Sequence, residues 1–249
     1  MNFLSLFSGI GGFDLALYNA GLKVDNHFFS EVDRHAVEFF RRHFPNARAL
    51  GDVRQIDYTS LPRGDWIITG SPPCQPFSSA GKKKGEADSR NLFPETIRSI
   101  QGLRPCFAIF ENVPGVLDYV DGKILPRIED IGYKTETIYL QARIVGADHK
   151  RERLWIIAYP DGIDVETRMV FFRAETSSLF KRYNQSRFSP KRWRDAVCSA
   201  DRGYDGVPKG VGIKCLGNAI VPQCAELFFM LPFFDKWREP GDIFSGGGA

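Results

Sequence analysis

Short apolar segments alternate with amphipathic segments through the first two thirds of the chain. The apolar segments are typical of buried strands, whereas hydrophobic residues at helical spacing, such as Val37, Phe40 and Phe44, indicate helices between them. Strands that alternate with helices favour an α/β fold with a doubly wound, mainly parallel sheet. We therefore expect strands at 3–7, 27–30, 66–69, 107–110, 135–140 and 154–158, and helices at 13–18, 34–44 and 95–103.

The alternation weakens in the last third, which divides the chain into three expected parts. Residues 1–158 form the main domain, and residues 209–240, with a helical stretch at 223–231, are expected to complete it. Residues 159–208 show no sustained period and are interpreted as a small separate module. The glycine-rich tail, residues 241–249, is expected to be disordered. A chain of 249 residues is long enough for one large domain with a small appendage.

The composition is that of a soluble globular protein, with 43% hydrophobic and 25% charged residues. No segment approaches the ~20 apolar residues that span a bilayer, and the first residues lack the basic region of a signal peptide. The five cysteines are odd in number and form no C-x-x-C pair. We therefore expect neither a disulfide framework nor a zinc site, and a reducing cytoplasm is the simpler expectation.

One cysteine, Cys74, lies in the run SPPCQPFS, residues 71–78, directly after the strand expected at 66–69. The prolines end that strand, because they donate no hydrogen bond to a ladder and fix their own φ. A thiol held in a stiff turn at the carboxyl end of a strand lies where open α/β folds bind their ligands. We interpret Cys74 as a nucleophile, the alternative being a buried structural cysteine.

A glycine-rich loop, FSGIGG at residues 7–12, follows the first expected strand. Its glycines allow the backbone to approach a ligand where the turn enters a helix. Glu31, at the end of the second expected strand, can accept hydrogen bonds from ribose hydroxyls, and Asp52 can face an adenine. Nicotinamide-dependent dehydrogenases share this layout, and a tight turn before a helix is the simpler alternative.

Charged residues adjoin two further expected strands. Glu111 follows the apolar segment 107–110 and is expected at the same sheet edge as Cys74 and the glycine loop. Arg151 and Arg153 are two residues apart in an extended segment, so both side chains can point the same way. The alternatives are a solvated glutamate and a surface salt-bridge cluster.

Basic residues are unevenly placed although the net charge is only +3. Residues 181–194 contain six basic residues, no acidic residue and three aromatic residues, a composition suited to phosphates and bases. The hydrophilic segment 79–90 carries three consecutive lysines that can also contact phosphates. In both segments the alternative is a solvated surface.

Taken in order, these segments resemble the C5-cytosine DNA methyltransferase family of bacterial and phage type. The resemblance is carried by FSGIGG (7–12), EV (31–32), DV (52–53), PPCQ (72–75), ENV (111–113), RER (151–153) and GNA (217–219). It covers residues 3–158 and about 205–231, and the PCQ and ENV motifs in this order, about 37 residues apart, are highly specific together. It implies a Rossmann-like S-adenosylmethionine-dependent methyltransferase with a small target-recognition module at 159–208.

The resemblance also implies an activity: transfer of a methyl group from S-adenosylmethionine to C5 of a flipped-out cytosine in duplex DNA. The base would be held in a covalent adduct on Cys74, S-adenosylhomocysteine would be the product, and no metal is needed. Glu111, Arg151 and Arg153 would be the other catalytic residues. The implied setting is a monomer in the cytoplasm of a bacterium or phage-infected cell, acting in restriction-modification or phage DNA protection, with a possible cognate restriction endonuclease.

Two further sets of residues are carried over from the family motifs. The implied cofactor contacts are Phe7, Ser8, Gly9, Ile10, Gly11, Gly12, Glu31, Val32, Asp52, Val53, Pro73, Leu92, Asn218 and Ala219. The implied DNA contacts are Gln75, Ser78, Lys82, Lys83, Lys84, Arg90, Lys181, Arg182, Arg187, Lys191, Arg192 and Arg194.

The sequence departs from the family at Val32, where a tryptophan often follows the ribose-binding glutamate, and at His149, where glutamine is common. Alternatives remain open. A tRNA cytosine-5 methyltransferase would share the motifs, but its Cys-Phe-Thr signature is not in this chain. A second alternative is a catalytically inactive DNA-binding or regulatory relative, against which the retained Cys74, Glu111 and arginine pair argue. A third is a nicotinamide dehydrogenase, a class in which nothing explains the PPCQ run. The small module suggests a short or degenerate target.

Overall fold

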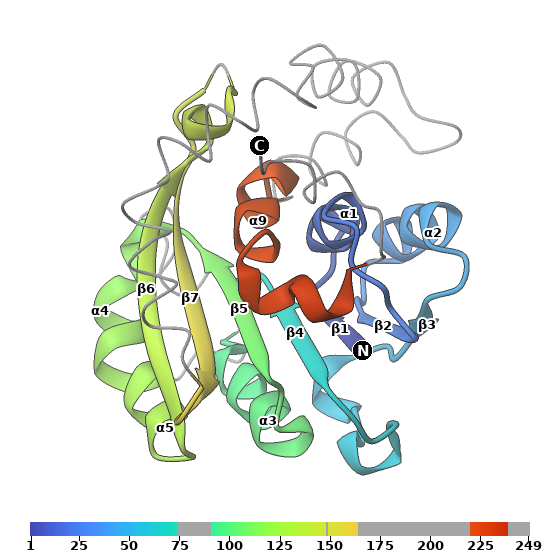
Figure 1. Ribbon diagram of the computed structural model, residues 1–249, viewed down its shortest axis with the longest axis horizontal. Coiled ribbons are helices and arrows are strands. Elements are labelled where there is room, and N and C mark those ends of the chain that lie inside the picture. The colour runs from blue at the N-terminus through green and yellow to red at the C-terminus, as the bar shows by residue number, and fades with distance from the viewer. Residues whose placement is uncertain (74–90, 148, 164–219, 239–249) are drawn as a thin grey trace, which may run out of the picture.

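A seven-stranded sheet forms the centre of the computed structural model, which describes residues 1–73, 91–147, 149–163 and 220–238 (Figure 1). The strand order is β3-β2-β1-β4-β5-β7-β6. The strands are β1 (Asn2–Leu6), β2 (Asn26–Ser30), β3 (Arg48–Ala49), β4 (Trp66–Gly70), β5 (Phe107–Asn112), β6 (Tyr133–Gln141) and β7 (Glu152–Pro160).

Pairing in the sheet is mostly parallel, which confirms the fold class expected from the sequence. β3, β2, β1, β4 and β5 run parallel to their neighbours, whereas β6 and β7 form an antiparallel hairpin placed against β5. Leu6, the last residue of β1, pairs with both Ser30 of β2 and Gly70 of β4. The carboxyl ends of these strands are therefore level, and the antiparallel β7 starts at the same edge.

Helices cover both faces of the sheet, with α1 (Gly12–Asn19) and α9 (Pro222–Phe229) on one face and α3 (Phe93–Leu103) on the other (Figure 1). α2 (Arg34–His43) packs against β2, where the rings of Phe40 and Phe29 stack at 4.0 Å. The remaining short elements are α4 (Leu117–Tyr119), α5 (Leu125–Glu129), the π turn η5 (Val120–Ile124), and the 3-10 turns η1 (Val53–Gln55), η2 (Tyr58–Ser60), η4 (Pro114–Val116), η6 (Ala142–Val145) and η7 (Pro232–Trp237).

Each buried strand contributes to two apolar cores because alternate side chains point to opposite faces. Phe3, Ile67 and Phe107 pack with α1 and α9, whereas Leu4 and Ile68 pack with α3. This two-sided burial explains why the central strands are nearly continuous apolar runs in the sequence.

The segment near the carboxyl end of the chain packs onto the main sheet. Trp155 of β7 lies between Phe13 of α1 and Phe228 of α9, with ring centroids 5.8 and 5.0 Å away. Asn19 donates a 2.6 Å hydrogen bond to Glu226 Oε1 of α9. These contacts hold α9 against the main sheet, and the predicted domain division, with residues 209–240 completing the main domain, stays a prediction.

Several boundaries differ from those expected. β5 extends through Glu111 and Asn112, because these two residues continue the ladder with Trp155 and Leu154 of β7. β7 begins at Glu152, because Glu152 and Arg153 pair with the end of β6. The two-residue strand β3 and the helical turns between β5 and β6 were not expected. The module at 159–208, beyond its first five residues, and the tail lie outside the described residues. None of the helices in the described ranges combines the length and the apolar composition that a transmembrane span requires.

A buried polar network joins α1 to β1 and β2. Asp14, which is fully buried, accepts a 2.9 Å hydrogen bond from Ser5 Oγ, and its other carboxylate oxygen lies 2.7 Å from His27 Nε2. A carboxylate only accepts, so Nε2 carries the proton and Nδ1 faces the Tyr18 hydroxyl at 3.3 Å. The network fixes α1, and with it the glycine loop, on the sheet.

We predict that Asp14→Ala lowers the free energy of unfolding by about 3 kcal/mol or more, because His27 and Ser5 lose their buried acceptor. Equilibrium denaturation measures the change. The matched control is Glu38→Ala, which removes an exposed carboxylate paired with Arg42 and is expected to cost about 0.5 kcal/mol or less. Equal losses in the two variants would show that the network does not stabilise the fold.

Candidate functional site

A cavity of about 540 Å³ lies at the carboxyl-end edge of the sheet. Its volume is within the usual range for small-molecule sites, about 300–1,000 Å³. It brings together segments that are far apart in the sequence, because β1, β2, β4 and β5 all end at this edge and β7 begins there. The predicted site residues that line it are Phe7, Ser8, Gly9, Gly12, Glu31, Val32, Asp52, Val53, Pro73, Leu92, Glu111, Arg151 and Arg153.

The glycine loop forms one wall of the cavity in a tight, left-handed backbone. Phe7 has φ 50°, a conformation that is uncommon for a residue with a side chain and is often found at functional sites. A Cβ on Gly11, at φ 83°, would lie 2.4 Å from the Phe44 ring, and one on Gly12 would lie 2.6 Å from Ile220. The loop therefore requires glycine at both positions.

Glu31 connects the glycine loop to the start of α2. Its Oε2 accepts a 2.9 Å hydrogen bond from the Gly9 amide, and its Oε1 accepts hydrogen bonds of 2.8 Å from the amides of Val32 and Asp33. A carboxylate offers about four acceptor sites, so Glu31 can still accept a ligand hydroxyl. Its neighbour Val32 lines the cavity with 71% of its surface exposed, which leaves an apolar face for a ligand.

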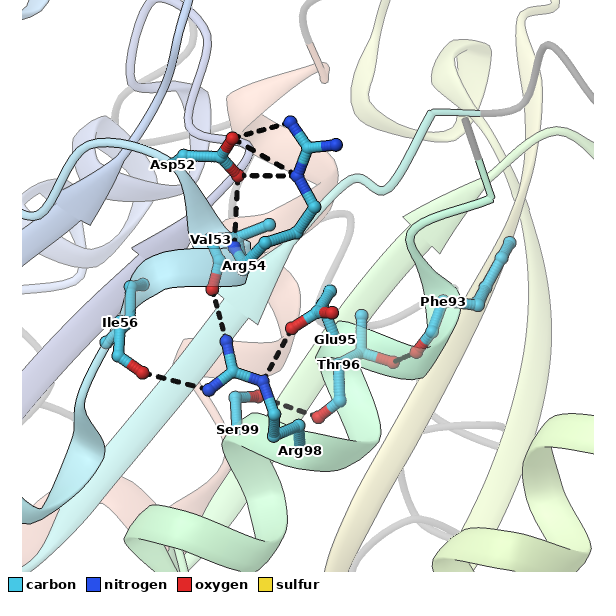
Figure 2. Close-up of polar contacts among 9 residues, drawn as sticks. All are labelled: Asp52, Val53, Arg54, Ile56, Phe93, Glu95, Thr96, Arg98 and Ser99. Atoms are coloured by element: carbon cyan, nitrogen blue, oxygen red, sulfur yellow. Dashed lines mark hydrogen bonds and ion pairs between the residues drawn. The ribbon is translucent and has the colours of Figure 1, made fainter. Parts of the chain in front are cut away.

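Asp52 lies on the wall next to Glu31, at the start of η1. Its carboxylate accepts hydrogen bonds from the Arg54 amide at 3.0 Å and from the Arg54 guanidinium at 2.5–3.1 Å (Figure 2). The guanidinium holds the pKa of Asp52 below its ordinary value, so that the carboxylate is charged at neutral pH. Asp52 is thus an acceptor at the cavity surface, beside the buried side chain of Val53.

Glu111 and two arginines form the opposite end of the cavity. Glu111 is buried, and its Oε1 lies 2.9 Å from Arg153 Nε, an ion pair without hydrogen-bond geometry. Burial raises the pKa of Glu111, although the charges of Arg153 and Arg151 oppose the shift. Because Glu111 and Arg153 lie on adjacent strands, the antiparallel hairpin is what brings them together.

Asn112, the last residue of β5, holds the segment that leads toward Cys74. Its Nδ2 donates a 2.8 Å hydrogen bond to the Pro72 carbonyl, and its Oδ1 accepts from the Val113 amide at 2.9 Å. Pro73, the last described residue of this segment, lines the cavity. The chain therefore enters the PPCQ run at the cavity edge.

Other predicted site residues are not brought to the cavity or lie outside the described residues. Ile10 and Gly11 do not line it, and Gly11 instead precedes α1 as its N-cap. The predicted nucleophile and the remaining contacts lie outside the described residues: Cys74, Gln75, Ser78, Lys82, Lys83, Lys84, Arg90, Lys181, Arg182, Arg187, Lys191, Arg192, Arg194, Asn218 and Ala219.

Sequence reasoning missed several residues that line the cavity: Phe13, Ser30, Asp33, Ala36, Arg54, Ser71, Pro72, Asn112, Val113 and Ile220. Pro72, Asn112 and Val113 belong to the PPCQ and ENV motifs themselves, and most of the others adjoin a predicted motif, which is the signal that could have found them. Ile220 has no such local signal except that it follows GNA, and it reaches the cavity by packing over Gly12. In the described part of the chain, no group of three or more metal-binding side chains is present.

Comparison with known proteins gives a consistent set of relatives. A profile of C-5 cytosine-specific DNA methylases matches residues 1–196. The type II methyltransferase M.Eco47II of Escherichia coli is 39% identical over an alignment covering 96% of this chain and 55% of that protein. The orphan methyltransferase M.SPRI of Bacillus phage SPR is 37% identical over 62% of this chain and 36% of that protein. The chain thus spans between about a third and about half of the length of these two relatives.

Solved structures show the same fold. A putative DNA modification methyltransferase encoded in an Escherichia coli prophage superposes with a TM-score of 0.55 and 29% identity, covering 67% of this chain and 49% of that one. A DNMT2 mutant of Spodoptera frugiperda has a TM-score of 0.56 at 24% identity, which is evidence for the fold alone.

We predict that the buried Glu111 makes stability depend on pH. In the folded protein its pKa is raised, so the folded state binds more protons than the unfolded state above about pH 4.3. Its contribution is present at lower pH and is lost as the pH rises through the folded pKa. The stability of the native chain relative to Glu111→Gln should therefore fall as the pH rises above about 4.3 and through the raised folded pKa, measured by denaturant unfolding. A difference that grows with pH would contradict this assignment.

Proposed function

Because the chain belongs to the C-5 cytosine-specific DNA methylase family, we propose that it transfers a methyl group from S-adenosylmethionine to C5 of cytosine in DNA. One observation carries the proposal. A single cavity joins the glycine loop, Glu31 and Asp52 to Glu111, Arg151 and Arg153, at the point where the chain enters the PPCQ run. The residues proposed to bind the cofactor and those proposed to act on the base thus line the same cavity.

The walls of the cavity fit S-adenosylmethionine. Val32 offers exposed apolar surface to the adenine, and the buried Val53 lines the same wall. Asp52 offers an acceptor to the adenine amino group, and Glu31 can accept ribose hydroxyls. Ser8 Oγ is buried without a hydrogen-bond partner among the described residues, and it lies in the glycine loop beside the cavity. A polar ligand would satisfy it. When bound, the cofactor supplies an electrophilic methyl group.

Cys74 is the proposed nucleophile. Its sulfur adds to C6 of the cytosine, which makes C5 electron-rich enough to accept the methyl group. A base then takes the C5 proton, the sulfur–C6 bond breaks, and the thiolate is restored. Burial raises the pKa of Cys106 and Cys224 to about 12, so among the described residues neither cysteine provides a thiolate at neutral pH.

Glu111 and the two arginines stabilise the ring while charge develops on it. A glutamate with a raised pKa can keep a proton near N3 and accept from the exocyclic amine. Arg153, which pairs with Glu111 in the cavity, is placed to turn toward the base O2, and Arg151 lies beside it. The ion pair holds both groups in position before the base enters.

The substrate we propose is duplex DNA, from which the target cytosine is flipped out at a cost of a few kcal/mol. The basic residues at 82–84 and 181–194 are the proposed phosphate contacts. We place the protein, as a monomer, in the cytoplasm of a bacterium or phage-infected cell. It would act in restriction-modification or DNA protection, with or without a cognate endonuclease.

Methyl transfer from labelled S-adenosylmethionine to duplex DNA tests the function. Cys74→Ser is predicted to lower the rate at least about a thousandfold, because the attacking sulfur is lost, while S-adenosylhomocysteine still binds. A duplex carrying 5-fluorocytosine should trap the native chain covalently, since fluorine cannot leave C5 as a proton does. The Cys74→Ser chain should not be trapped.

Cys106→Ser is the control, because Cys106 is a half-buried thiol that donates to the Trp66 carbonyl away from the cavity. It should keep nearly native activity. Methyl transfer to tRNA but not to DNA would show that duplex DNA is not the substrate. Activity retained in Cys74→Ser would refute the covalent mechanism.

A further inference from the structure

Arg98 of α3 reaches across to the segment that carries Asp52 and Val53. Its guanidinium donates to the carbonyl oxygen of Val53 through Nη2 and to that of Ile56 through Nη1, the latter at 2.8 Å (Figure 2). The third side of the same guanidinium, Nε, donates a 2.6 Å hydrogen bond to Glu95 Oε2, one helical turn earlier. The planar guanidinium of Arg98 is thus oriented by Glu95 of α3 and donates hydrogen bonds to the Val53 and Ile56 carbonyls on the other side.

The Val53 carbonyl, at the start of η1, also accepts the Ile56 amide at 3.4 Å. The Ile56 carbonyl lies just after the last residue of η1, where backbone acceptors have no donor within the turn. The other end of η1 is capped by Asp52, whose carboxylate accepts from the Arg54 amide at 3.0 Å. The turn behind the expected adenine contacts is therefore capped at both ends. The cap at its carboxyl end comes from a helix more than forty residues away in the sequence.

The same helix carries a second part of the cavity wall. Leu92 lines the cavity directly before α3 begins at Phe93, and Phe93 is fully buried. The Arg98 guanidinium also lies 4.8 Å from the centroid of the Tyr58 ring in η2, a cation–π contact. Arg98 thus fixes the separation between the wall formed by Asp52 and Val53 and the wall that begins at Leu92.

We propose that Arg98 is a positioning residue that sets the adenine end of the cofactor pocket. This inference rests on the proposed function, because it takes the ligand of the cavity to be S-adenosylmethionine. Arg98 acts through the backbone of η1 and touches neither the reacting base nor the transferred methyl group. Its loss should therefore weaken cofactor binding and leave the chemical step nearly unchanged once the cofactor is saturating.

The test compares Arg98→Gln and Arg98→Lys with the native chain in the binding of S-adenosylhomocysteine and in methyl transfer. Arg98→Gln should raise the Kd and the KM for S-adenosylmethionine about tenfold or more, with kcat within about twofold, because two charge-assisted hydrogen bonds are lost. Arg98→Lys keeps the charge but replaces the planar guanidinium with one ammonium group that cannot match its two Nη donors, so its Kd should lie between those of the native chain and Arg98→Gln.

Arg104→Gln is the matched control at the end of the same helix. Arg104 makes the same kinds of contact, a 2.6 Å hydrogen bond to the Ile131 carbonyl and a cation–π contact with Tyr133 at 4.9 Å, away from the cavity. Its Kd should stay native. An unchanged Kd in both Arg98 variants would overturn the inference, and so would an equal rise in Arg104→Gln, since a general weakening of α3 would then explain both.

Hydrogen exchange in the ligand-free chain separates this inference from the proposed function. The amides of Gln55 and Ile56, which bond within η1 to Asp52 and Val53, should exchange faster in Arg98→Gln but not in Arg104→Gln. Unchanged exchange overturns the positioning role. The native chain could also fail to bind S-adenosylhomocysteine while the η1 amides exchange faster in Arg98→Gln. That result would confirm that Arg98 stabilises η1 and would refute the cofactor assignment.

Discussion

The site depends on the level ends of the parallel strands. Leu6 pairs with both Ser30 and Gly70, so the chain leaves β1, β2 and β4 at the same height. The departing segments supply a glycine loop, an acidic residue and the run that leads to Cys74. A shift of one strand by a single residue would turn its side chains to the opposite face and separate these groups. The apolar cores on both faces prevent such a shift, because every strand residue in the centre is already packed.

The antiparallel hairpin adds the second half of the site. A parallel strand beside β5 would present its carboxyl end here, whereas β7 presents its beginning, and with it Arg151 and Arg153. The pairing of Glu111 with Trp155 then sets Arg153 within 2.9 Å of the glutamate. A buried carboxylate alone would be costly, so the two guanidiniums offset part of its desolvation while burial still raises its pKa. The result is a glutamate whose pKa is raised where the base is expected.

The sequence allowed the fold class and much of the cavity to be predicted, because Glu31 and Asp52 follow local patterns and FSGIGG directly follows an apolar run. Other features depend on pairing that no local pattern shows. The polar residues Glu111 and Asn112 extend β5 only because β7 supplies ladder partners. Pro114 and Gly122 interrupt the helical hydrophobic pattern that would have indicated the turns before β6.

Long-range contacts are equally hidden in the sequence. Arg98 is like any helix-surface arginine there, and its hydrogen bonds to η1 are seen only when α3 and η1 lie side by side in the fold. Ile220 reaches Gly12 by long-range packing.

We infer that one cavity at this sheet edge holds the cofactor at its Glu31 end and the reacting base at its Glu111 end. A crystal structure of the chain with S-adenosylhomocysteine would show where each part of the cofactor lies. We expect the ribose against Glu31, the adenine between Val32 and the Asp52–Val53 wall, and the sulfur directed toward Glu111. Density for the ligand at another place, or in this cavity with the sulfur turned away from Glu111, would contradict it.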